Sequence, residues 1–497
     1  MSDFIPPHPP RLPRPPTPWE RVRLGRQNLL ATFEEQAFGY EFMSMKLLAR
    51  EVFLCNTPES VQFAFSTHND SFERKSPGHR RSLEPLLGDG LFVSHGDVWR
   101  RRRRIVAPIV HVSRLAEFAP VMVETAQGAC HRWAGLGPSA EIDALNEMAQ
   151  LTAEIICRTV FGRQLGRERA LQLVEGFTDY QQRVGQMDFL SLLGLPEWLP
   201  QPHPPGIYRS VRRVHKVLDE LIAGHRANGD RDDASIVGRL LDARDEETGA
   251  PLDTRALRNE AAVLLMAGHE TTANTLAWTW YILSQVPDVE AALHAEVDRV
   301  LEGRPPTLAD VPKLVYTRAV LEEVLRLYPP VPLLTREAVR DEKFHTCHIP
   351  EGSLIVVCPW LLHRHRLIWP KPDHFIPERF LPGGFRPTSK FAYIPFSIGP
   401  RICTGMAFGL TEAILTIATI AQNFMLRLVP GHRVEVACRL TLRPGERLPM
   451  WLVPRRPLVG EAADTGATPA MQAAGTAAAG AADGPAECPY HRETARE

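Results

Sequence analysis

Ten residues near the C-terminal end of the chain, Phe396–Gly405 with the sequence FSIGPRICTG, constrain its fold more than any other segment. The glycine at 399 predicts a loop that leads to Cys403, and Gly405 opens a strongly periodic helix over roughly 406–423. Cys403 therefore lies at a helix N-terminus, where the positive helix end and unpaired N–H groups favour a thiolate. This arrangement predicts a cysteine that acts as a ligand.

The neighbours of Cys403 indicate what it binds. Glycines at 399 and 405 let a flat group approach the backbone, Phe396 can pack on that group, and Arg401 can meet an acidic substituent at its edge. These features together describe haem. The alternative is a buried structural cysteine, which is the usual fate of an intracellular cysteine.

The segment resembles the cysteine-ligand loop of the cytochrome P450 family, whose pattern is F-x-x-G-x-R-x-C-x-G. Five fixed positions match: Phe396, Gly399, Arg401, Cys403 and Gly405. The resemblance implies that Cys403 is the metal ligand and that all five residues bind haem. Other motifs of the family occur in the family's order and cover roughly residues 30–455.

Composition excludes several other classes of protein. The chain has 497 residues, 44% of them hydrophobic and 23% charged, as in an ordinary globular protein. A formal net charge of −1 argues against a nucleic-acid binder. Eight cysteines without a C-x-x-C pair suit a reducing cytosol and offer no zinc site. No apolar run near the N-terminus reaches the roughly 20 residues that span a bilayer, so we expect a cytoplasmic protein without a membrane span.

Three segments are expected along the chain. Residues 1–28 form a proline-rich N-terminal arm, whose PPHPPRLPRPPTP stretch favours an extended strap. Residues 29–457 form the haem-thiolate catalytic domain. Residues 458–497 are rich in Ala, Gly and Thr, bury too little apolar surface to fold, and predict a disordered tail.

The secondary structure is expected to be mainly helical. Residues 40–68 predict two short strands and a helix after Thr57. Helical periodicity dominates from about 97 to 302, interrupted by a proline-rich loop at 195–206. Short apolar runs broken by glycine and proline, at 345–358 and 424–455, predict small sheets.

A long helix, expected from a cap near Asp253 to a stop at Pro287, contains the second motif, AGHETT. A glycine inside a helix costs about 1 kcal/mol relative to alanine, so Ala267 and Gly268 suggest space for a flat cofactor. The alternative is a structural kink.

The same motif looks like the A/G-G-x-D/E-T segment of the family, in which an acid and an alcohol guide protons during dioxygen activation. The resemblance gives these catalytic roles to Glu270 and Thr271. His269, between them and the glycine, is interpreted as a bystander.

A third motif places Glu323 and Arg326 on one helix face, a spacing that alone means little because exposed pairs of this kind are common. With Arg379 in FIPERF, however, the pair resembles the E-x-x-R helix and the P-E-R-F segment of the family. The resemblance implies a buried Glu-Arg-Arg triad that holds the haem pocket, a structural role.

Arginines that bind the haem carboxylates are expected on several elements. Trp99 and Arg103 match a W-x-x-x-R pattern of the family, and Arg336 matches a further propionate-binding position. Arg101 and Arg102, in the same five-arginine run, point elsewhere by helical geometry. They form either a solvated face or a docking patch for an acidic electron-transfer protein.

The resemblance implies a mainly α protein with small β-sheet regions, in the triangular cytochrome P450-like fold, with haem between the long central helix and the cysteine-loop helix. The cofactors would be haem b with an axial thiolate and dioxygen as co-substrate. The function would be a monooxygenase that receives two electrons, from a ferredoxin and its reductase, and inserts one oxygen atom into a hydrophobic organic substrate. The alternatives are a peroxide-driven or isomerising haem-thiolate enzyme and a non-enzymatic haem sensor.

The family also suggests which residues touch the substrate. The positions fall in loop 72–95, in the region 175–210, near the AGHETT motif, and at the apolar residues Val331, Leu333, Leu334 and Leu442. These apolar side chains predict a small hydrophobic substrate. We expect the protein to be a monomer.

Overall fold

The computed structural model describes residues 3–162, 167–184, 203–228, 235–438 and 440–455. By their contacts, residues 1–456 form one unit, from which residues 457–497 are divided. The expected tail at 458–497 and most of the proline-rich loop at 195–206 lie outside the described residues.

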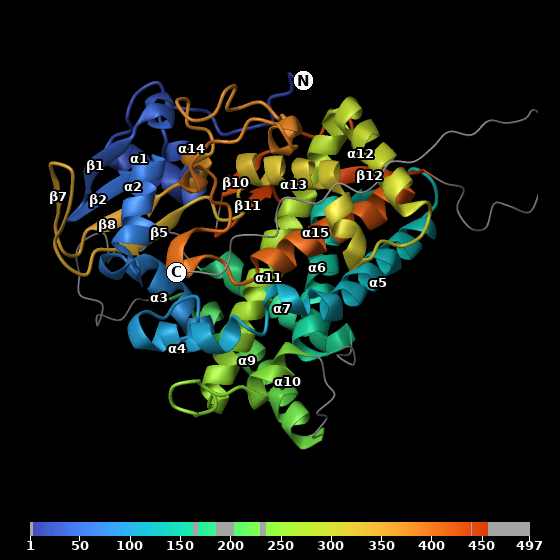
Figure 1. Ribbon diagram of the computed structural model, residues 1–497, viewed down its shortest axis with the longest axis horizontal. Helices are drawn as coiled ribbons and strands as arrows, with labels where there is room; N and C mark the ends of the chain where they lie inside the picture. The colour runs from blue at the N-terminus through green and yellow to red at the C-terminus, as the bar shows by residue number, and fades with distance from the viewer. Residues whose placement is uncertain (1–2, 163–166, 185–202, 229–234, 439, 456–497) are drawn as a thin grey trace, which may run out of the picture. The chain divides into compact units, whose positions relative to one another are not determined.

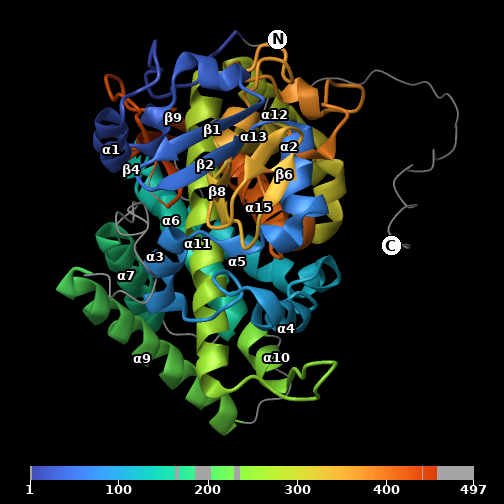
Figure 2. The ribbon, with the colours of Figure 1, turned by 90° about the vertical axis from the view of Figure 1, so that its left-hand side faces the viewer.

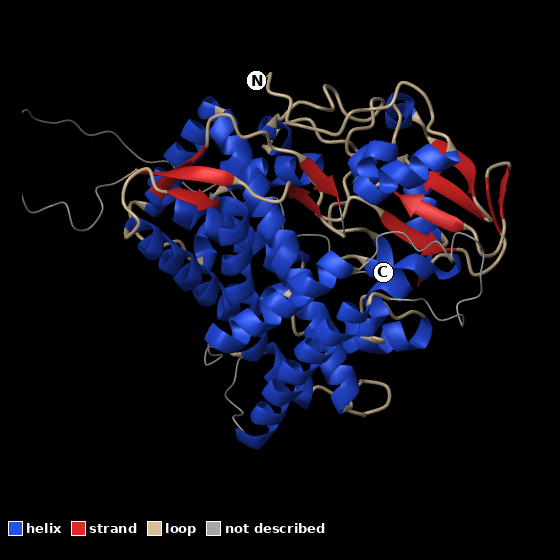
Figure 3. Cartoon of the chain, turned by 180° about the vertical axis from the view of Figure 1, so that it is seen from behind, coloured by secondary structure: helices blue, strands red, loops and turns tan. Residues whose placement is uncertain are grey.

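Helices make up most of the first unit (Figures 1 and 3). Their bounds are α1 Pro18–Gln27, α2 Pro58–Gln62, α3 Pro77–Leu87, α4 Gly96–Val106, α5 Leu115–Ala134, α6 Ala144–Phe161, α7 Arg167–Arg183, α9 Pro205–Asn228, α10 Ile236–Asp242, α11 Thr254–Gln285, α12 Pro287–Leu301, α13 Val315–Leu327, α14 Pro359–Leu362 and α15 Met406–Asn423. The helix expected over 406–423 is therefore confirmed.

The strands are short, as the broken apolar runs predict. Their bounds are β1 Phe42–Leu47, β2 Arg50–Cys55, β3 Arg74–Lys75, β4 Glu141–Asp143, β5 Leu334–Glu337, β6 Glu342–Phe344, β7 Cys347–Ile349, β8 Leu354–Val357, β9 Phe424–Leu428, β10 Val436–Cys438, β11 Leu442–Pro444 and β12 Pro449–Pro454. They form a five-stranded sheet in the order β1-β2-β8-β5-β3, a three-stranded sheet β4-β12-β9, and two pairs, β6-β7 and β10-β11.

The five-stranded sheet joins segments that are far apart in the sequence. The two expected strands, β1 and β2, pair as an antiparallel hairpin, and Thr57 caps the helix expected after it. β2 pairs in parallel with β8, while β5 lies antiparallel to both β8 and β3. The β3–β5 register places Lys75 directly opposite Arg336.

Helix α11 is the longest described helix, with 32 residues. It begins as expected after Asp253, whose carboxylate accepts a hydrogen bond from the backbone N of Ala256 at 2.7 Å. Figure 2 shows α11 running from top to bottom of the unit, with β1, β2 and β8 in front of its upper half. It packs against α6 and α15, so the cysteine-loop helix lies beside the central helix.

The N-terminal arm is not separate from the rest of this unit. Leu12 forms a parallel bridge with Glu34, and the Tyr328 hydroxyl donates to the carbonyl of Pro7 at 2.6 Å. The arm is non-helical over residues 3–17, and α1 then forms residues 18–27.

None of the helices in the described part of the chain combines the length and hydropathy needed to cross a lipid bilayer.

Candidate haem-thiolate site

Backbone hydrogen bonds within the cysteine loop, Phe396–Gly405, hold its two ends together. The N–H of Cys403 donates to the carbonyl of Phe396 at 2.9 Å, and the N–H of Ile402 donates to Gly399 at 3.0 Å. Gly405 is the residue before α15. Cys403 thus lies at the N-terminal end of this helix, as the sequence predicts.

The glycine at 399 has a different reason from the one expected. Its φ is 75°, and a Cβ atom there would lie 1.9 Å from the carbonyl oxygen of Phe65. Only glycine allows this approach of two backbone segments. At Gly405 a Cβ would meet nothing nearer than the Cys403 sulfur at 3.9 Å, so that position stays open on the side of the ligand.

The surroundings of Cys403 change the acidity of its thiol. Its side chain is exposed, yet burial by the surrounding residues raises the pKa of the thiol, while the Gly405 N–H and Arg103 lower it. The helix terminus alone therefore does not produce the expected thiolate, because burial has the larger effect. A metal cation bound to the sulfur would deprotonate it outright.

Helix α4 holds the cysteine loop from one side. Arg103 donates to the carbonyl of Ile402 at 2.7 Å, and the Arg401 guanidinium lies 4.5 Å above the ring of the buried Trp99. Arg401 also donates to the carbonyl of Ser94 at 2.6 Å. The W-x-x-x-R pair thus contacts the loop that carries the cysteine.

The middle of α11 presents its polar motif at an exposed surface. Ala267 is exposed within an otherwise largely buried helix. The Thr271 hydroxyl donates to the carbonyl of Ala267 at 2.7 Å. Gln181 of α7 donates to the Glu270 carboxylate at 2.6 Å.

The other two residues of this motif face elsewhere. A Cβ atom at Gly268 would lie 2.6 Å from Ile156 of α6, so helix packing, and not a flat cofactor, explains the glycine. His269 is buried, and burial lowers its pKa to about 4. It therefore remains a neutral bystander, as expected.

A group of basic side chains, here called the cation cluster, consists of Lys75, His79, Arg336 and Arg401. Lys75, Arg336 and Arg401 repel one another, and Glu73 offsets part of this repulsion at Arg401; no ion pair joins any of the four residues to a carboxylate of the described part of the chain. Burial and this mutual repulsion lower the pKa of His79 to about 4, of Arg336 to about 9 and of Lys75 well below its usual range. Burial also lowers the pKa of Arg401 to about 10. The cation cluster therefore requires negative charge from elsewhere.

Three of the four expected substrate contacts meet at one small cavity. Its lining residues are Lys75, His79, Phe92, Val331, Leu333, Leu334 and Thr335. Leu442 is not among them. It is fully buried in β11, where its carbonyl accepts from the Trp278 indole at 3.3 Å. Residues 185–202 of the expected substrate region lie outside the described residues.

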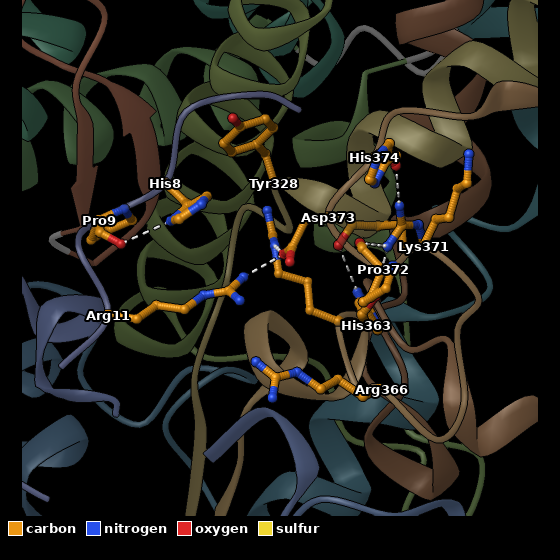
Figure 4. Close-up of polar contacts among 12 residues, drawn as sticks. His8, Pro9, Arg11, Tyr328, His363, Arg366, Lys371, Pro372, Asp373 and His374 are labelled. Carbon is orange, nitrogen blue, oxygen red and sulfur yellow. Dashed lines mark hydrogen bonds and ion pairs between the residues drawn. The ribbon is translucent and has the colours of Figure 1, made fainter. Parts of the chain in front are cut away.

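A second group of charges, here called the charged centre, consists of Glu323, Arg326 and Arg379. Arg326 is fully buried and uses all five of its N–H groups. Two bond the Glu323 carboxylate at 2.6 and 2.7 Å, and three bond the carbonyls of His363 (2.8 Å), Pro372 (2.7 Å) and His374 (2.9 Å). Arg379 approaches the same carboxylate at 3.4 Å. Figure 4 labels His363, Pro372 and His374, the three residues that supply these carbonyls.

The two arginines of α4 expected to point away from the haem differ in exposure: Arg102 is buried, whereas Arg101 remains partly exposed. Arg102 is buried and pairs with Asp89 at 3.2 Å and with the buried Glu260 at 3.5 Å. Arg101 pairs with Asp245 at 3.4 Å. Both earlier interpretations of Arg102 are wrong, because these arginines tie α4 to neighbouring parts of the same chain.

Sequence reasoning missed Lys75, His79 and Gln181. No local pattern distinguishes Lys75 from the neighbouring basic residues. Lys75 reaches the site because β3 pairs with β5, and Gln181 because α7 lies near the middle of α11. The positive charges of Lys75 and Arg336, opposite each other on neighbouring strands, would have indicated an anion-binding site. This signal can be read only when the register of the two strands is known.

Comparison with known proteins agrees with this geometry. The family model described as Cytochrome P450 matches residues 7–444. The chain is 33% identical over 421 residues to cyclooctatin synthase of Streptomyces melanosporofaciens, covering 83% of this chain and 88% of the relative. It is 34% identical to cyclooctat-9-en-7-ol 5-monooxygenase of the same organism, covering 74% and 79%, and 30% identical to pentalenene oxygenase of Streptomyces avermitilis, covering 79% and 85%.

Solved structures show the same fold. The haem domain of cytochrome P450DA superposes with a TM-score of 0.73 at 27% identity, covering 84% of this chain and 90% of that one. Retinoic acid-bound cyanobacterial CYP120A1 gives a TM-score of 0.71 at 27% identity, covering 83% and 92%. The fold, the cysteine loop and these matches agree, and the chain belongs to the cytochrome P450 family of haem-thiolate monooxygenases.

Proposed function

We propose that this monooxygenase oxidises a ring-containing hydrocarbon or its alcohol, with Cys403 as the haem ligand and with Glu270 and Thr271 moving protons. One observation carries the proposal. A cysteine at the N-terminus of α15 lies two residues from Arg401 of the cation cluster, and none of the four members of this cluster forms an ion pair with a carboxylate of the described residues. No structural role of Cys403 would require both features.

The residues present fit haem. Its two carboxylates would supply the negative charge that the cation cluster lacks, with Trp99 and Arg103 holding the cysteine loop in place. Bound haem supplies redox-active iron, whose thiolate ligand donates electron density that favours O–O cleavage. Phe396, Gly405 and Ala267 remain the proposed contacts with its flat faces.

The proposed proton path uses the exposed face of α11. The Thr271 hydroxyl donates to Ala267 and keeps its lone pairs free to accept a hydrogen bond. The carboxylate of Glu270, oriented by Gln181, can exchange protons with water at the same surface. Thr271 thus orients a proton that Glu270 supplies.

The substrate class rests on the relatives and on the apolar side chains at the expected substrate positions. Val331, Leu333 and Leu334 offer an apolar wall, and Phe92 adds an aromatic one. Two relatives are named for cyclooctat-9-en-7-ol and pentalenene. We therefore propose that the substrate is a ring-containing hydrocarbon or its alcohol, such as a cyclic terpene.

The electron supply and location are also proposals. We propose a separate ferredoxin with its reductase as electron donor, and a monomer in the cytoplasm. The seven cysteines in the described part of the chain are unpaired, which supports a reducing compartment. Reconstitution with a ferredoxin and its reductase tests the donor.

The ligand is tested with Cys403→Ser. The variant should lose the strongly red-shifted Soret band of the reduced carbon monoxide complex. If the band remained, another residue would be the ligand.

The proton path is tested with Thr271→Val, which keeps nearly the same volume but removes the hydroxyl. Haem and substrate binding should persist, while product per electron falls and hydrogen peroxide appears. Thr272→Val is the matched control, since Thr272 points about 100° further round the helix. Equal product per electron in the Thr271 variant and the parent would reopen the peroxide-driven alternative.

A further inference from the structure

His363, directly after α14, is fully buried, and both of its ring nitrogens are hydrogen-bonded to the backbone. The N–H of Ile394 lies 2.9 Å from Nε2, and the carbonyl of Arg326 lies 3.2 Å from Nδ1. A backbone N–H can only donate, so Nε2 is the acceptor. Nδ1 therefore carries the proton and donates to Arg326, which fixes the tautomer.

The ring joins two parts of the site that are separate in the sequence. On one side is Arg326 of the charged centre, which also donates to the carbonyl of His363 at 2.8 Å. On the other side is Ile394, whose carbonyl accepts from the N–H of Ser397 at 3.0 Å in the turn that leads into the cysteine loop. A single imidazole thus connects the charged centre to the entrance of that loop.

The link does not depend on pH near neutrality. Burial and the positive charge of Arg326 lower the pKa of His363 to about 3. The ring therefore stays neutral, and its acceptor nitrogen remains available to Ile394. Figure 4 shows His363 beside Pro372, which also receives a hydrogen bond from Arg326.

We propose that His363 is a positioning residue for Cys403: it transmits the rigidity of the charged centre through Ile394 to the cysteine loop and so holds the sulfur in place. This inference rests on Cys403 as the haem ligand. It assigns no proton transfer to His363, which acts only through the loop.

The chain supplies a matched control two residues away. His365 is also buried, with Nε2 3.2 Å from the carbonyl of Tyr40 and Nδ1 accepting from the N–H of Leu367 at 3.3 Å. It has the same size, burial and number of backbone bonds. It differs in leading toward the N-terminal part of the sheet instead of the cysteine loop.

The test compares His363→Asn, His363→Gln and His365→Asn as haem-loaded proteins. Asparagine can still donate near Nδ1 but cannot reach the N–H of Ile394, whereas glutamine reaches further and can accept from it. The measurement is the rate at which the red-shifted carbon monoxide band converts to the band of protein without a thiolate ligand. Amide hydrogen exchange of residues 394–403 without haem gives a second readout.

We expect His363→Asn to accelerate the conversion about tenfold, the effect of one lost hydrogen bond. It should also increase exchange at 394–403. His363→Gln should show a smaller change, and His365→Asn should stay within about twofold of the parent even if it lowers global stability. Equal acceleration in the His363→Asn and His365→Asn variants, or none in His363→Asn, would overturn the proposal. Absence of the red-shifted band in the parent would instead refute the ligand assignment.

Discussion

The charged centre and the cation cluster both bury guanidinium groups, but they differ in where the compensating charge comes from. In the charged centre Arg326 finds an acceptor for every N–H group, and Glu323 serves two arginines and the N–H of Ile376. In the cation cluster Arg336 stands opposite Lys75 on the neighbouring strand, with no carboxylate partner in the described residues.

This difference separates a structural site from a ligand site. Buried charges are tolerated when they are mutually paired and hydrogen-bonded, and breaking one such pair leaves an uncompensated charge. Like charges directly opposite one another on a sheet destabilise it. A region that keeps such charges therefore indicates binding of an anion, here the carboxylates of haem.

The largest expected effect tests the first half of the comparison. Glu323→Ala would leave Arg326 buried without its carboxylate, which typically costs 3–5 kcal/mol. Urea unfolding of the haem-free protein should show this loss, and little haem-loaded protein should be recovered. Glu322→Ala is the control, because Glu322 pairs with the half-exposed Arg386. Similar stability of the two variants would mean that the charged centre is not structural.

Removing a cation from the cation cluster should not destabilise the haem-free protein, in contrast to Glu323→Ala, and should weaken haem binding. Arg336→Met relieves repulsion in the haem-free protein, whose melting temperature should stay the same or rise. Haem should dissociate roughly ten- to hundredfold faster, because a hydrogen bond to a charged group contributes roughly 1.5–3 kcal/mol. Transfer of haem to an acceptor protein measures the rate. A haem-free variant as unstable as Glu323→Ala would remove the distinction between the two regions.

The pH dependence of stability gives a smaller test of the cation cluster. The pKa of His79 is lowered to about 4 by burial and by Lys75. Between pH 6.5 and 4 the unfolded chain therefore binds a proton that the folded haem-free protein does not, so stability falls as pH falls through this window. His79→Asn should flatten this slope in urea titrations at pH 5 and 7.

Bound haem should also flatten the slope, because its carboxylates favour the protonated ring. An unchanged slope in the His79→Asn variant would show that other buried histidines, such as His363, cause it.

The sequence allowed prediction of the features that depend on residues close together in the chain. The position of Cys403 before a helix, the cap at Asp253 and the spacing of Glu323 and Arg326 depend on neighbours within a few residues. The charge imbalance at Lys75 and Arg336 could not be predicted, since it arises from pairing of distant strands. Gly268 shows the same limit, because its sequence context suggests space for a cofactor while the close neighbour is Ile156.

A third way of burying charge gives the smallest expected effect. Glu412 of α15 is fully buried beside the Thr272 hydroxyl, and no cation of the described residues pairs with its carboxyl group. Burial raises its pKa well above the usual range, so the group carries a proton at neutral pH. Glu412→Gln then exchanges one neutral group for another and should change the free energy of unfolding by less than about 1 kcal/mol at pH 5.

The sign of the pH dependence sharpens this last prediction. Because the folded protein retains a proton on Glu412 that the unfolded chain releases above its ordinary pKa, the contribution of Glu412 to stability should fall as pH rises, and the glutamine variant should lack this contribution. Urea titrations should therefore show that the free energy of unfolding of the variant, relative to that of the parent, is higher at pH 8 than at pH 5. Strong destabilisation of the variant at pH 5 would mean that Glu412 is ionised and paired, which would place it with the charged centre.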